Sequence, residues 1–256
     1  MTKPERSVAI VTGARRGIGA AIAVSLAGSG FDVAITDIAD DGADETLSAI
    51  AAAGGQARFL RSDIADVADH ARALDDVLGW RGRIDCLVNN AGISAPRRGD
   101  LLELGPQAFD QVLGVNLRGT FFFTQAVAQR MLNAPAAGPR SIITISSVNA
   151  ELASIERGEY SMSKAGLAML TKLFALRLAA NGIAVFEVRP GVIRTSMTQV
   201  VAEKYERRIA DGLVPMGRWG APRDVGEAVA GLASGRFAFS TGSVLHVDGG
   251  LAVPRL

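Results

Sequence analysis

Cysteine and histidine are scarce in this chain of 256 residues. Cys86 is the only cysteine, so no disulfide forms within the chain, and a reducing compartment is the natural setting. The two histidines, His70 and His246, are far apart in sequence and have no companion ligands at metal-binding spacing. We therefore expect a cytoplasmic protein that holds no metal.

A strong net charge and long apolar runs are absent as well. The formal net charge of +1 gives no reason to expect a nucleic acid or an anionic membrane as a partner. No apolar stretch is long enough to cross a membrane without charges or glycines, and the one near the start is too short for a signal peptide. Apolar residues still make up 48% of the chain, which is enough for a sizeable core. We expect one soluble domain over residues 1–256.

Seven short apolar segments alternate with longer segments of helical length. The short segments are apolar on both faces, as in the strands of a parallel sheet that helices cover on both sides. This alternation predicts an α/β protein with a doubly wound, seven-stranded parallel sheet flanked by helices. Strands are expected at 7–13, 32–37, 57–63, 84–92, 140–147, 183–191 and 243–250, and helices at 17–29, 41–53, 66–80, 106–133, 160–181 and 222–234.

A glycine-rich loop, "TGARRGIG" at 12–19, follows the first expected strand and opens the first helix. Gly13, Gly17 and Gly19 allow a tight turn and let the backbone approach a pyrophosphate, while N–H groups at the helix start face the phosphates. Asp37 ends the second strand, where a carboxylate accepts hydrogen bonds from ribose hydroxyls. The loop predicts a dinucleotide site; the alternative is a structural turn that binds nothing.

A tyrosine and a lysine lie four positions apart in "EYSMSK" at 159–164. That spacing puts Tyr160 and Lys164 on one face of a helix. Free tyrosine titrates near pH ~10, and a neighbouring ammonium group favours the phenolate and lowers that pKa. The pair therefore suits proton transfer, although an ordinary surface pair is the alternative for these two residues alone.

Together, three motifs resemble the short-chain dehydrogenase/reductase family. They are the glycine loop, with its spacing G-x-x-x-G-x-G, the sequence "NNAG" at 89–92, and Tyr160-x-x-x-Lys164. The motifs occur in the family's order, and the resemblance extends from Val8 to Gly250. It implies a Rossmann-type fold, NAD(P)-dependent interconversion of a ketone and a secondary alcohol, and a homodimer or homotetramer. The overall sequence looks most like 3-oxoacyl-(acyl-carrier-protein) reductases, whose substrate is an acyl-chain carbonyl compound.

The resemblance assigns four catalytic residues. Tyr160 is the general acid/base, and Lys164 is its cationic neighbour. Ser147, 13 residues before Tyr160, holds the substrate oxygen, with the adjacent Ser146 as the competing candidate. Asn116 interrupts its helix and supports a water-linked proton path. In the alternative, it is a polar helix residue whose side chain hydrogen-bonds the local backbone.

The resemblance also implies a set of cofactor contacts. Asp63 matches a residue that bonds the adenine, although it could instead cap the next helix. The segment after the sixth strand matches the one that holds the nicotinamide carboxamide. The full set is Gly13, Arg15, Arg16, Gly17, Ile18, Gly19, Asp37, Asp63, Ile64, Asn89, Ala91, Gly92, Tyr160, Lys164, Pro190, Gly191, Ile193 and Thr195.

The residues around the expected ribose site give conflicting signals on the cofactor. Asp37 would repel a 2′-phosphate by ~1–4 kcal/mol at contact distance, depending on the local dielectric. Against this, Arg15 and Arg16 lie in the glycine loop, where a basic residue often accompanies phosphorylated cofactors in the family. Because the carboxylate is expected closest to the 2′ position, we expect NAD, with NADP as the alternative.

The substrate is less defined than the cofactor. Residues 195–216 lie where the family has a mobile substrate lid. Four apolar or aromatic residues of this segment either line a substrate pocket or form the ordinary packed face of an amphipathic segment: Met197, Val201, Tyr205 and Leu213. Four polar residues are expected at the catalytic rim or on the plain surface: Asn149, Glu151, Glu156 and Arg157. Arg97 and Arg98, near the "NNAG" loop, belong to a solvated loop or meet an anionic substrate tail. An NAD-dependent dehydrogenase of a sugar, a polyol or another small secondary alcohol is the alternative enzyme, and a nucleotide-binding sensor or scaffold is the alternative outside catalysis.

Overall fold

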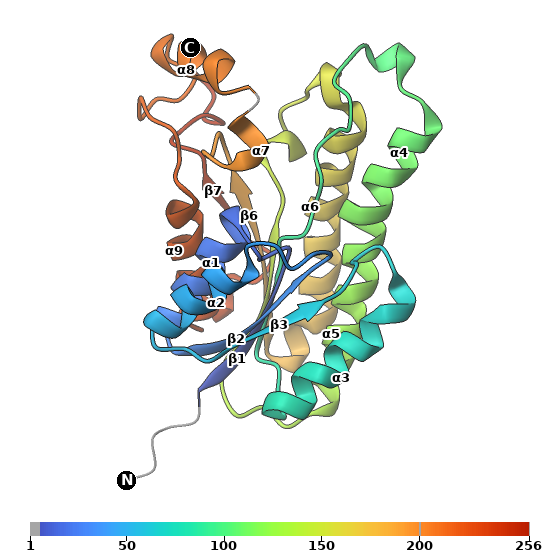
Figure 1. Ribbon diagram of the computed structural model, residues 1–256, viewed down its shortest axis with the longest axis vertical. Helices are drawn as coiled ribbons and strands as arrows, with labels where there is room; N and C mark the ends of the chain where they lie inside the picture. Colours follow the sequence, from blue (N-terminus) through green and yellow to red (C-terminus); the bar gives the residue numbers. More distant parts are fainter. Residues whose placement is uncertain (1–5, 200, 256) are drawn as a thin grey trace.

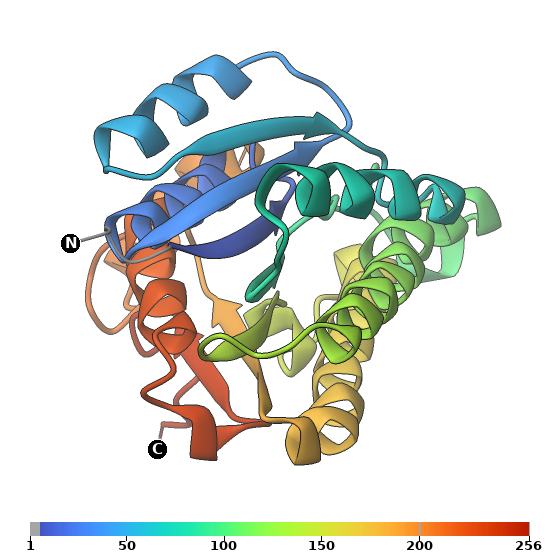
Figure 2. The same ribbon diagram turned by 90° about the horizontal axis from the view of Figure 1, so that it is seen from below.

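The protein is built on one parallel β-sheet covered by helices on both faces (Figures 1 and 2). The computed structural model describes residues 6–199 and 201–255. The strand order is β3-β2-β1-β4-β5-β6-β7, and all neighbouring strands run parallel. The predicted doubly wound Rossmann-type fold is thus confirmed. The strands are β1 (Ser7–Thr12), β2 (Phe31–Asp37), β3 (Ala57–Arg61), β4 (Cys86–Asn89), β5 (Arg140–Ile145), β6 (Ile183–Pro190) and β7 (Val244–Val247).

Two helical layers enclose the sheet, as Figure 2 shows from below. One layer contains α1 (Gly17–Gly28), α2 (Ala43–Ala52) and α9 (Pro222–Ala233). The other contains α3 (His70–Arg81), α4 (Pro106–Leu113), α5 (Thr120–Asn133) and α6 (Gly158–Leu178). Two short helices, α7 (Ser196–Gln199) and α8 (Ala202–Ala210), lie above the sheet in Figure 1. No helix of the described residues is long and apolar enough to span a membrane.

The strands are apolar on both faces because each face packs against a helical layer. In β1, Ala9 and Val11 belong to the hydrophobic cluster that includes Ile22 of α1. Val8 and Ile10 belong to the cluster on the opposite face. Successive side chains of a strand point to opposite faces, so one uninterrupted apolar run fills two cores.

The expected helix at 106–133 is interrupted in the structure. Residues Gly114–Gly119 form a π-helical segment between α4 and α5. Within this wider turn, the Asn116 side chain hydrogen-bonds both main-chain groups of Ile93. A π-helical turn inside a helix frequently marks a functional site. Sequence periodicity alone predicted one continuous helix because the segment keeps helical spacing on either side.

The ends of other helices also differ from those expected. Helix α3 begins at His70 rather than at 66, because the Asp66 carboxylate caps a separate 3₁₀ turn over Val67–Asp69. Helix α6 ends at Leu178, and one 3₁₀ turn follows before Gly182, whose φ of 68° provides the left-handed ending.

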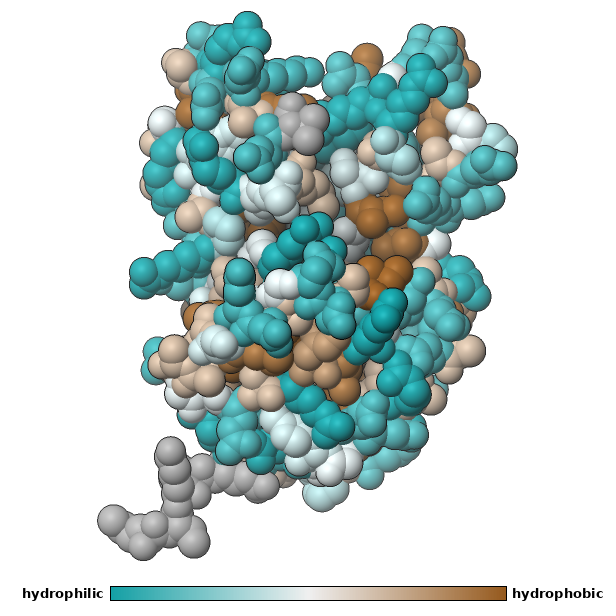
Figure 3. Space-filling model, in the orientation of Figure 1, coloured by the Kyte–Doolittle hydropathy of each residue, from teal (hydrophilic) through white to brown (hydrophobic). Residues whose placement is uncertain are grey.

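Apolar side chains are exposed along the outer side of α6. Met169, Leu173 and Leu176 are 53%, 53% and 83% exposed. Figure 3 shows hydrophobic side chains gathered on the part of the surface formed by the helices α4 to α6.

The order of the strands places a crevice above the sheet. From β1 the chain proceeds outward to β2 and β3 and then returns to β4 on the other side of β1. The loops that leave β1 and β4 therefore diverge, and in doubly wound sheets ligands bind at such a point.

Candidate active site

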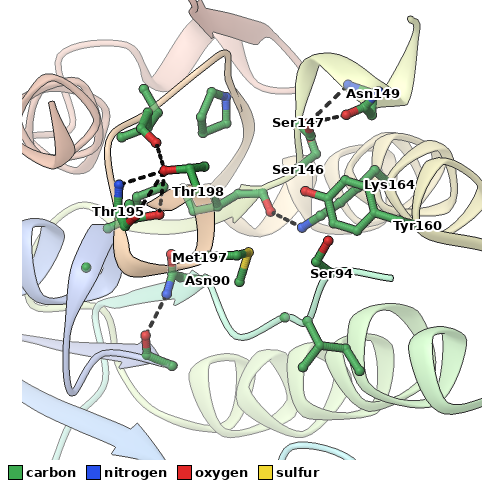
Figure 4. A pocket seen from close by; sticks show the side chains of 18 of the residues that line it. Asn90, Ser94, Ser146, Ser147, Asn149, Tyr160, Lys164, Thr195, Met197 and Thr198 are labelled. Carbon is green, nitrogen blue, oxygen red and sulfur yellow. Dashed lines mark hydrogen bonds between the residues drawn. The ribbon is translucent and has the colours of Figure 1, made fainter. Parts of the chain in front are cut away.

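A cavity of about 810 Å³ lies at the carboxyl ends of the strands. Its wall comes from the loops that follow β1, β2, β3, β4, β5 and β6, together with residues of α6 and α8 (Figure 4). Every cofactor residue predicted from the sequence lines this cavity except Asn89. Of the four predicted catalytic residues, Ser147, Tyr160 and Lys164 line it, whereas Asn116 lies behind the wall.

The two asparagines of "NNAG" have different positions. The Asn89 side chain is buried and donates hydrogen bonds to Thr124 and Thr144 at 2.8 and 3.3 Å. Asn90 lines the cavity instead, and its amide donates to the carbonyl oxygens of Thr12 and Gly13 at 2.9 and 2.8 Å. The Asn89 side chain thus braces the core, and Asn90, which the sequence reasoning missed, ties the glycine loop to β4. The doubled asparagine in the motif was the available signal.

The glycine loop lies so close to its neighbours that side chains are excluded. A Cβ on Gly13, whose φ is +63°, would lie 2.7 Å from the Cα of Ala91. A Cβ on Gly19 would lie 2.4 Å from the carbonyl oxygen of Gly13. The first turn of α1 follows Arg16, whose side chain does not cap it. Bare backbone and uncapped N–H groups facing a cavity fit the diphosphate of a dinucleotide.

The arginine of the loop is held by carboxylates. Arg15 Nε lies 3.3 Å from Asp37 Oδ1, and the guanidinium also pairs with Asp41. The main-chain N–H of Arg15 donates to the other oxygen of Asp37 at 3.3 Å. Arg16, the second basic residue, is exposed. The charged groups at this place are therefore one cation and two anions, and this excess of negative charge does not favour an added phosphate.

Asp63 lies at the cavity wall and does not cap the next helical turn, where Asp66 is the capping residue. Asp63 lines the cavity next to Ile64, and its Oδ1 accepts a hydrogen bond from the N–H of Ala65 at 2.9 Å. The carboxylate is therefore oriented by its own turn at the cavity wall.

Tyr160 and Lys164 extend from α6 into the cavity below Ser147 (Figure 4). The Nζ atom of Lys164 donates to the carbonyl oxygen of Ile145 at 3.1 Å and lies 5.6 Å from the centre of the Tyr160 ring. Ser147 follows β5, and its hydroxyl lies close enough to the phenol to lower the pKa of Tyr160. The phenol, the hydroxyl and the ammonium group thus converge from two elements.

Burial controls the ionisation of this pair. Although the cavity leaves Tyr160 partly accessible, desolvation raises the pKa of its phenol above the ordinary value, and the hydroxyl of Ser147 and the charges of Arg157 and Arg98 oppose that rise. We had expected Lys164 to be the cation that lowers this pKa. In the structure burial outweighs every lowering influence, and the cations that act on the phenol are the two arginines. Burial also lowers the pKa of Lys164 to about 8, while the charge of Glu187 opposes that change.

Asn116 connects the loop after β4 to helix α6. It is fully buried; its Oδ1 accepts from the N–H of Ile93 at 2.8 Å, and its Nδ2 donates to the carbonyl of Ile93 at 2.9 Å. The same Nδ2 donates to Ser163 Oγ at 3.0 Å. Asn116 therefore fixes the position of α6 one residue before Lys164.

The choice between the two serines follows from Glu187. Ser146 donates to the buried carboxylate of Glu187 at 2.5 Å, so its hydroxyl is already engaged. Arg189 neutralises that carboxylate with its Nε 2.6 Å away. Ser147 instead faces Tyr160, and its Oγ accepts from the N–H of Asn149 at 3.1 Å. This arrangement favours Ser147 over Ser146 as the group that meets a substrate.

The rim contains only some of the polar residues expected there. Asn149, Glu156, Arg157 and Arg98 line the cavity. Glu151 turns away and pairs with Arg189 and with His246 Nε2 at 3.6 Å, and Arg97 lines a smaller separate pocket.

The segment after β6 supplies the opposite wall. Pro190, Gly191, Ile193 and Thr195 all line the cavity, and Thr198 donates to the carbonyl of Ile193 at 2.9 Å. Of the four lid residues considered, Met197, Tyr205 and Leu213 line the cavity, whereas Val201 does not. Within residues 6–199 and 201–255, no group of His, Cys, Asp or Glu side chains could hold a metal ion.

Known proteins resemble this chain over nearly its whole length. A family model described as Enoyl-(Acyl carrier protein) reductase matches residues 13–252. A 3-oxoacyl-[acyl-carrier protein] reductase from Brucella melitensis, solved in complex with NAD, is 53% identical, with a TM-score of 0.96 and coverage of 99% of this chain and 100% of that one. The (3R)-3-hydroxyacyl-CoA dehydrogenase of Mus musculus is 36% identical over 253 residues, which cover 96% of both chains.

A further structure was solved with bound NADP. It comes from Agrobacterium tumefaciens, is named as a 2-deoxy-D-gluconate 3-dehydrogenase, and is 38% identical with a TM-score of 0.86, covering 98% of both chains. The motifs, the fold and these relatives agree, and the chain belongs to the short-chain dehydrogenase/reductase family of oxidoreductases.

Proposed function

We propose that this protein is an NAD-dependent oxidoreductase that interconverts a ketone and a secondary alcohol, with Tyr160 as its general acid/base. The observation that carries the proposal is the convergence of the Tyr160 phenol, Ser147 and Lys164 at one wall of a cavity that also contains the glycine loop. We treat residues 1–256 as one catalytic domain, with residues 195–216 as the substrate lid.

Each of these side chains has a distinct task in the proposed reaction. When bound, the nicotinamide ring exchanges a hydride with the substrate carbon. Ser147 holds the substrate oxygen by a hydrogen bond, and Tyr160 gives that oxygen a proton during reduction and removes it during oxidation. Lys164, fixed to the carbonyl of Ile145, holds a buried positive charge beside the phenol. Asn116 keeps α6 in register and takes part in the path by which the proton reaches solvent.

NAD is the cofactor that the ribose end of the cavity fits better. Arg15 is engaged by Asp37 and Asp41, so a 2′-phosphate would meet carboxylates without a free guanidinium from that residue. The exposed Arg16 is the remaining cation of the loop. The relatives themselves differ, since one structure holds NAD and another holds NADP.

The names of the relatives suggest two classes of substrate. One class is a 3-oxoacyl or 3-hydroxyacyl group on a carrier, as in the Brucella melitensis and Mus musculus proteins. The other is a sugar-like hydroxy acid, as in the Agrobacterium tumefaciens protein. Both are compounds in which the reacting carbon lies near a carboxyl group or its thioester, and the proposal covers this common feature.

Assembly and location form part of the same proposal. The exposed Met169, Leu173 and Leu176 of α6 would be covered if two copies paired along this helix, as in a homodimer or homotetramer. A single buried cysteine suits the cytoplasm.

A substrate panel tests the proposal directly. Ketones and secondary alcohols from both classes would be incubated with NADH or NADPH, or with the oxidised forms, and followed by the absorbance of the reduced nicotinamide. We expect turnover of at least one compound, faster with the unphosphorylated cofactor. Binding of the cofactor without turnover of any compound would instead support a sensor or scaffold.

A further inference from the structure

We propose that Arg157 and Arg98 form an anion site at the substrate end of the cavity, and that the substrate is a small hydroxy or oxo acid whose own carboxylate binds there. This inference rests on the proposed function, because the anion site and the catalytic residues share one cavity. It commits to a free acid rather than to a carrier thioester.

The guanidinium of Arg157 is held beside the reacting phenol by neutral groups. Its Cζ lies 5.1 Å from the centre of the Tyr160 ring, and its Nη2 donates to Asn149 Oδ1 at 2.9 Å. Asn149 is itself fixed, since its Nδ2 donates to the carbonyl of Leu152 at 2.9 Å. The side chain therefore has a defined position with donors to spare.

No carboxylate neutralises either arginine within the described part of the chain. Glu156, next to Arg157 in sequence, pairs with Lys204 Nζ at 3.5 Å, and Asp100, two residues after Arg98, accepts from the N–H of Leu102 at 3.0 Å. Arg157 and Arg98 are both partly buried at the cavity wall. A guanidinium withdrawn from water without a counter-charge is unfavourable, and it is relieved when an anion binds.

The charged side chains at this end of the cavity are mostly cationic. Glu156 is the one carboxylate among the residues that line it there. The cations are Arg98, Arg157, Lys164, Lys204 and Arg208. Even with Lys204 paired to Glu156, the balance of charge there is positive, whereas at the ribose end Asp37 and Asp63 are matched by Arg15 and Arg16. The excess of positive charge in the cavity therefore lies at the substrate end.

The location of the arginines determines which anion fits. The two segments that carry the arginines meet, since the N–H of Gly99 donates to the carbonyl oxygen of Glu156 at 3.3 Å, and both arginines line the cavity with Tyr160, whose pKa their charges lower. An anion that contacts both therefore lies near the reacting carbon. In a carrier-bound substrate this place holds a neutral thioester, and the phosphate is separated from it by the whole pantetheine arm. A carboxylate on the substrate's own short skeleton meets the guanidinium, with which it forms paired, charge-assisted hydrogen bonds.

Pairs of an acid and its methyl ester test the inference by turnover. The pairs are those of 2-hydroxybutyrate, 3-hydroxybutyrate and 4-hydroxypentanoate, and the N-acetylcysteamine thioester of 3-hydroxybutyrate represents the carrier substrate. We expect wild-type kcat/KM to favour at least one acid over its ester by about tenfold or more, in line with one charge-assisted contact. Arg157→Met and Arg98→Met should each reduce that ratio several-fold. Since acid and ester are compared in the same variant, any change in the pKa of Tyr160 affects both and cancels.

Arg97→Met is the matched control, because Arg97 is in the same loop as Arg98 but lines a different pocket. It should leave the acid-to-ester ratio unchanged. A wild-type preference for the esters or the thioester, or an unchanged ratio in Arg157→Met, would overturn the anion site.

A binding measurement separates this inference from the proposed chemistry. Acetoacetate would be titrated by calorimetry into Tyr160→Phe loaded with NAD, and into the same protein carrying Arg157→Met. We expect saturable binding that weakens about tenfold or more with the second change. If acetoacetate binding depends on Arg157 but the wild type turns over no compound, the proposed reaction is refuted and the anion site stands. Absent binding, or binding indifferent to Arg157, would refute the anion site alone.

Discussion

The ammonium nitrogen of Lys164 donates a hydrogen bond to the carbonyl oxygen of Ile145 at 3.1 Å. Ile145 is the last residue of β5, and Ser147 lies two positions later. The contact therefore joins the helix that contains Tyr160 to the strand that presents Ser147. Lys164 is four residues from Tyr160, and Ile145 is two residues from Ser147. Because the bond lies so near both reacting groups, it holds the phenol and the hydroxyl at a fixed separation before any ligand binds.

The pH dependence of alcohol oxidation should respond to Arg157. Oxidation needs the phenolate of Tyr160, and the positive charge of Arg157 lowers the pKa of this phenol. In Arg157→Met that influence is lost, the pKa rises, and the ascending limb of kcat/KM against pH should move to higher pH. A neutral alcohol should be used, so that the anion site does not contribute.

Arg97→Met again provides the comparison for that profile, since it removes the same charge from outside the cavity. The ascending limb of kcat/KM against pH for Arg97→Met should coincide with that of the wild type. A limb that stays in place in Arg157→Met, or moves to lower pH, would mean that Tyr160 is not the titrating base.

The cofactor preference should depend on Asp37. The wild type should bind NADH more tightly than NADPH, because Asp37 repels a 2′-phosphate by ~1–4 kcal/mol at contact distance. Asp37→Ala removes that repulsion and releases Arg15 from one of its two partners, so the ratio of Kd for NADPH to Kd for NADH should fall by about tenfold or more. Fluorescence titration of the reduced cofactors measures both constants.

Asp40→Ala is the control, because Asp40 is an exposed carboxylate of equal charge outside the cavity wall. In Asp40→Ala the ratio of Kd for NADPH to Kd for NADH should remain close to that of the wild type. Tighter binding of NADPH by the wild type would defeat the assignment of NAD.

Two glycines in helices should respond in opposite ways to alanine. At Gly19 the added Cβ would lie 2.4 Å from the carbonyl oxygen of Gly13 and 2.6 Å from Asn90 Nδ2. Gly19→Ala should therefore lower the free energy of unfolding by about 1–3 kcal/mol and weaken cofactor binding. At Gly79 of α3 a Cβ meets no atom within 4 Å, so Gly79→Ala should raise that free energy by about 0.5–1 kcal/mol. Urea unfolding of both variants checks this, and equal effects would show that the loop is not tightly packed.

The buried ion pair of Glu187 and Arg189, which Ser146 contacts, should contribute strongly to stability. Glu187 is 0% exposed and pairs with Arg189, which is 4% exposed. Glu187→Ala leaves a buried guanidinium with only an exposed partner, Glu151, and should cost about 3–5 kcal/mol of unfolding free energy. Glu151→Ala, which removes that exposed partner, should cost about 1 kcal/mol or less. If urea unfolding gave the two variants the same loss, the buried pair would not have the role described.

The fold and most of the cavity wall could be predicted from the sequence because local signals determine them. Short apolar strands, the glycine loop and the spacing of Tyr160 and Lys164 are all features of neighbouring residues. The interruption of the helix at Asn116 was indicated only by the family resemblance, since its cause is a pair of hydrogen bonds to Ile93, which is distant in sequence.

Contacts between distant segments account for what the sequence left open. Nothing near Ser146 in sequence indicates that Glu187 accepts its hydroxyl, or that Glu151 turns toward Arg189 rather than the cavity. Similarly, the rise in the pKa of Tyr160 reflects burial by the assembled loops, which cannot be estimated from a neighbouring lysine.

Tyr160→Phe provides the most direct test of the account, because it removes one oxygen atom and leaves the ring in place. The two quantities to measure are kcat on the best substrate of the panel and the Kd for NADH. We predict that kcat falls by at least about 10²-fold, as expected when a general acid/base is lost, while the Kd for NADH changes little. A variant that turns over at the wild-type rate would contradict the proposed chemistry.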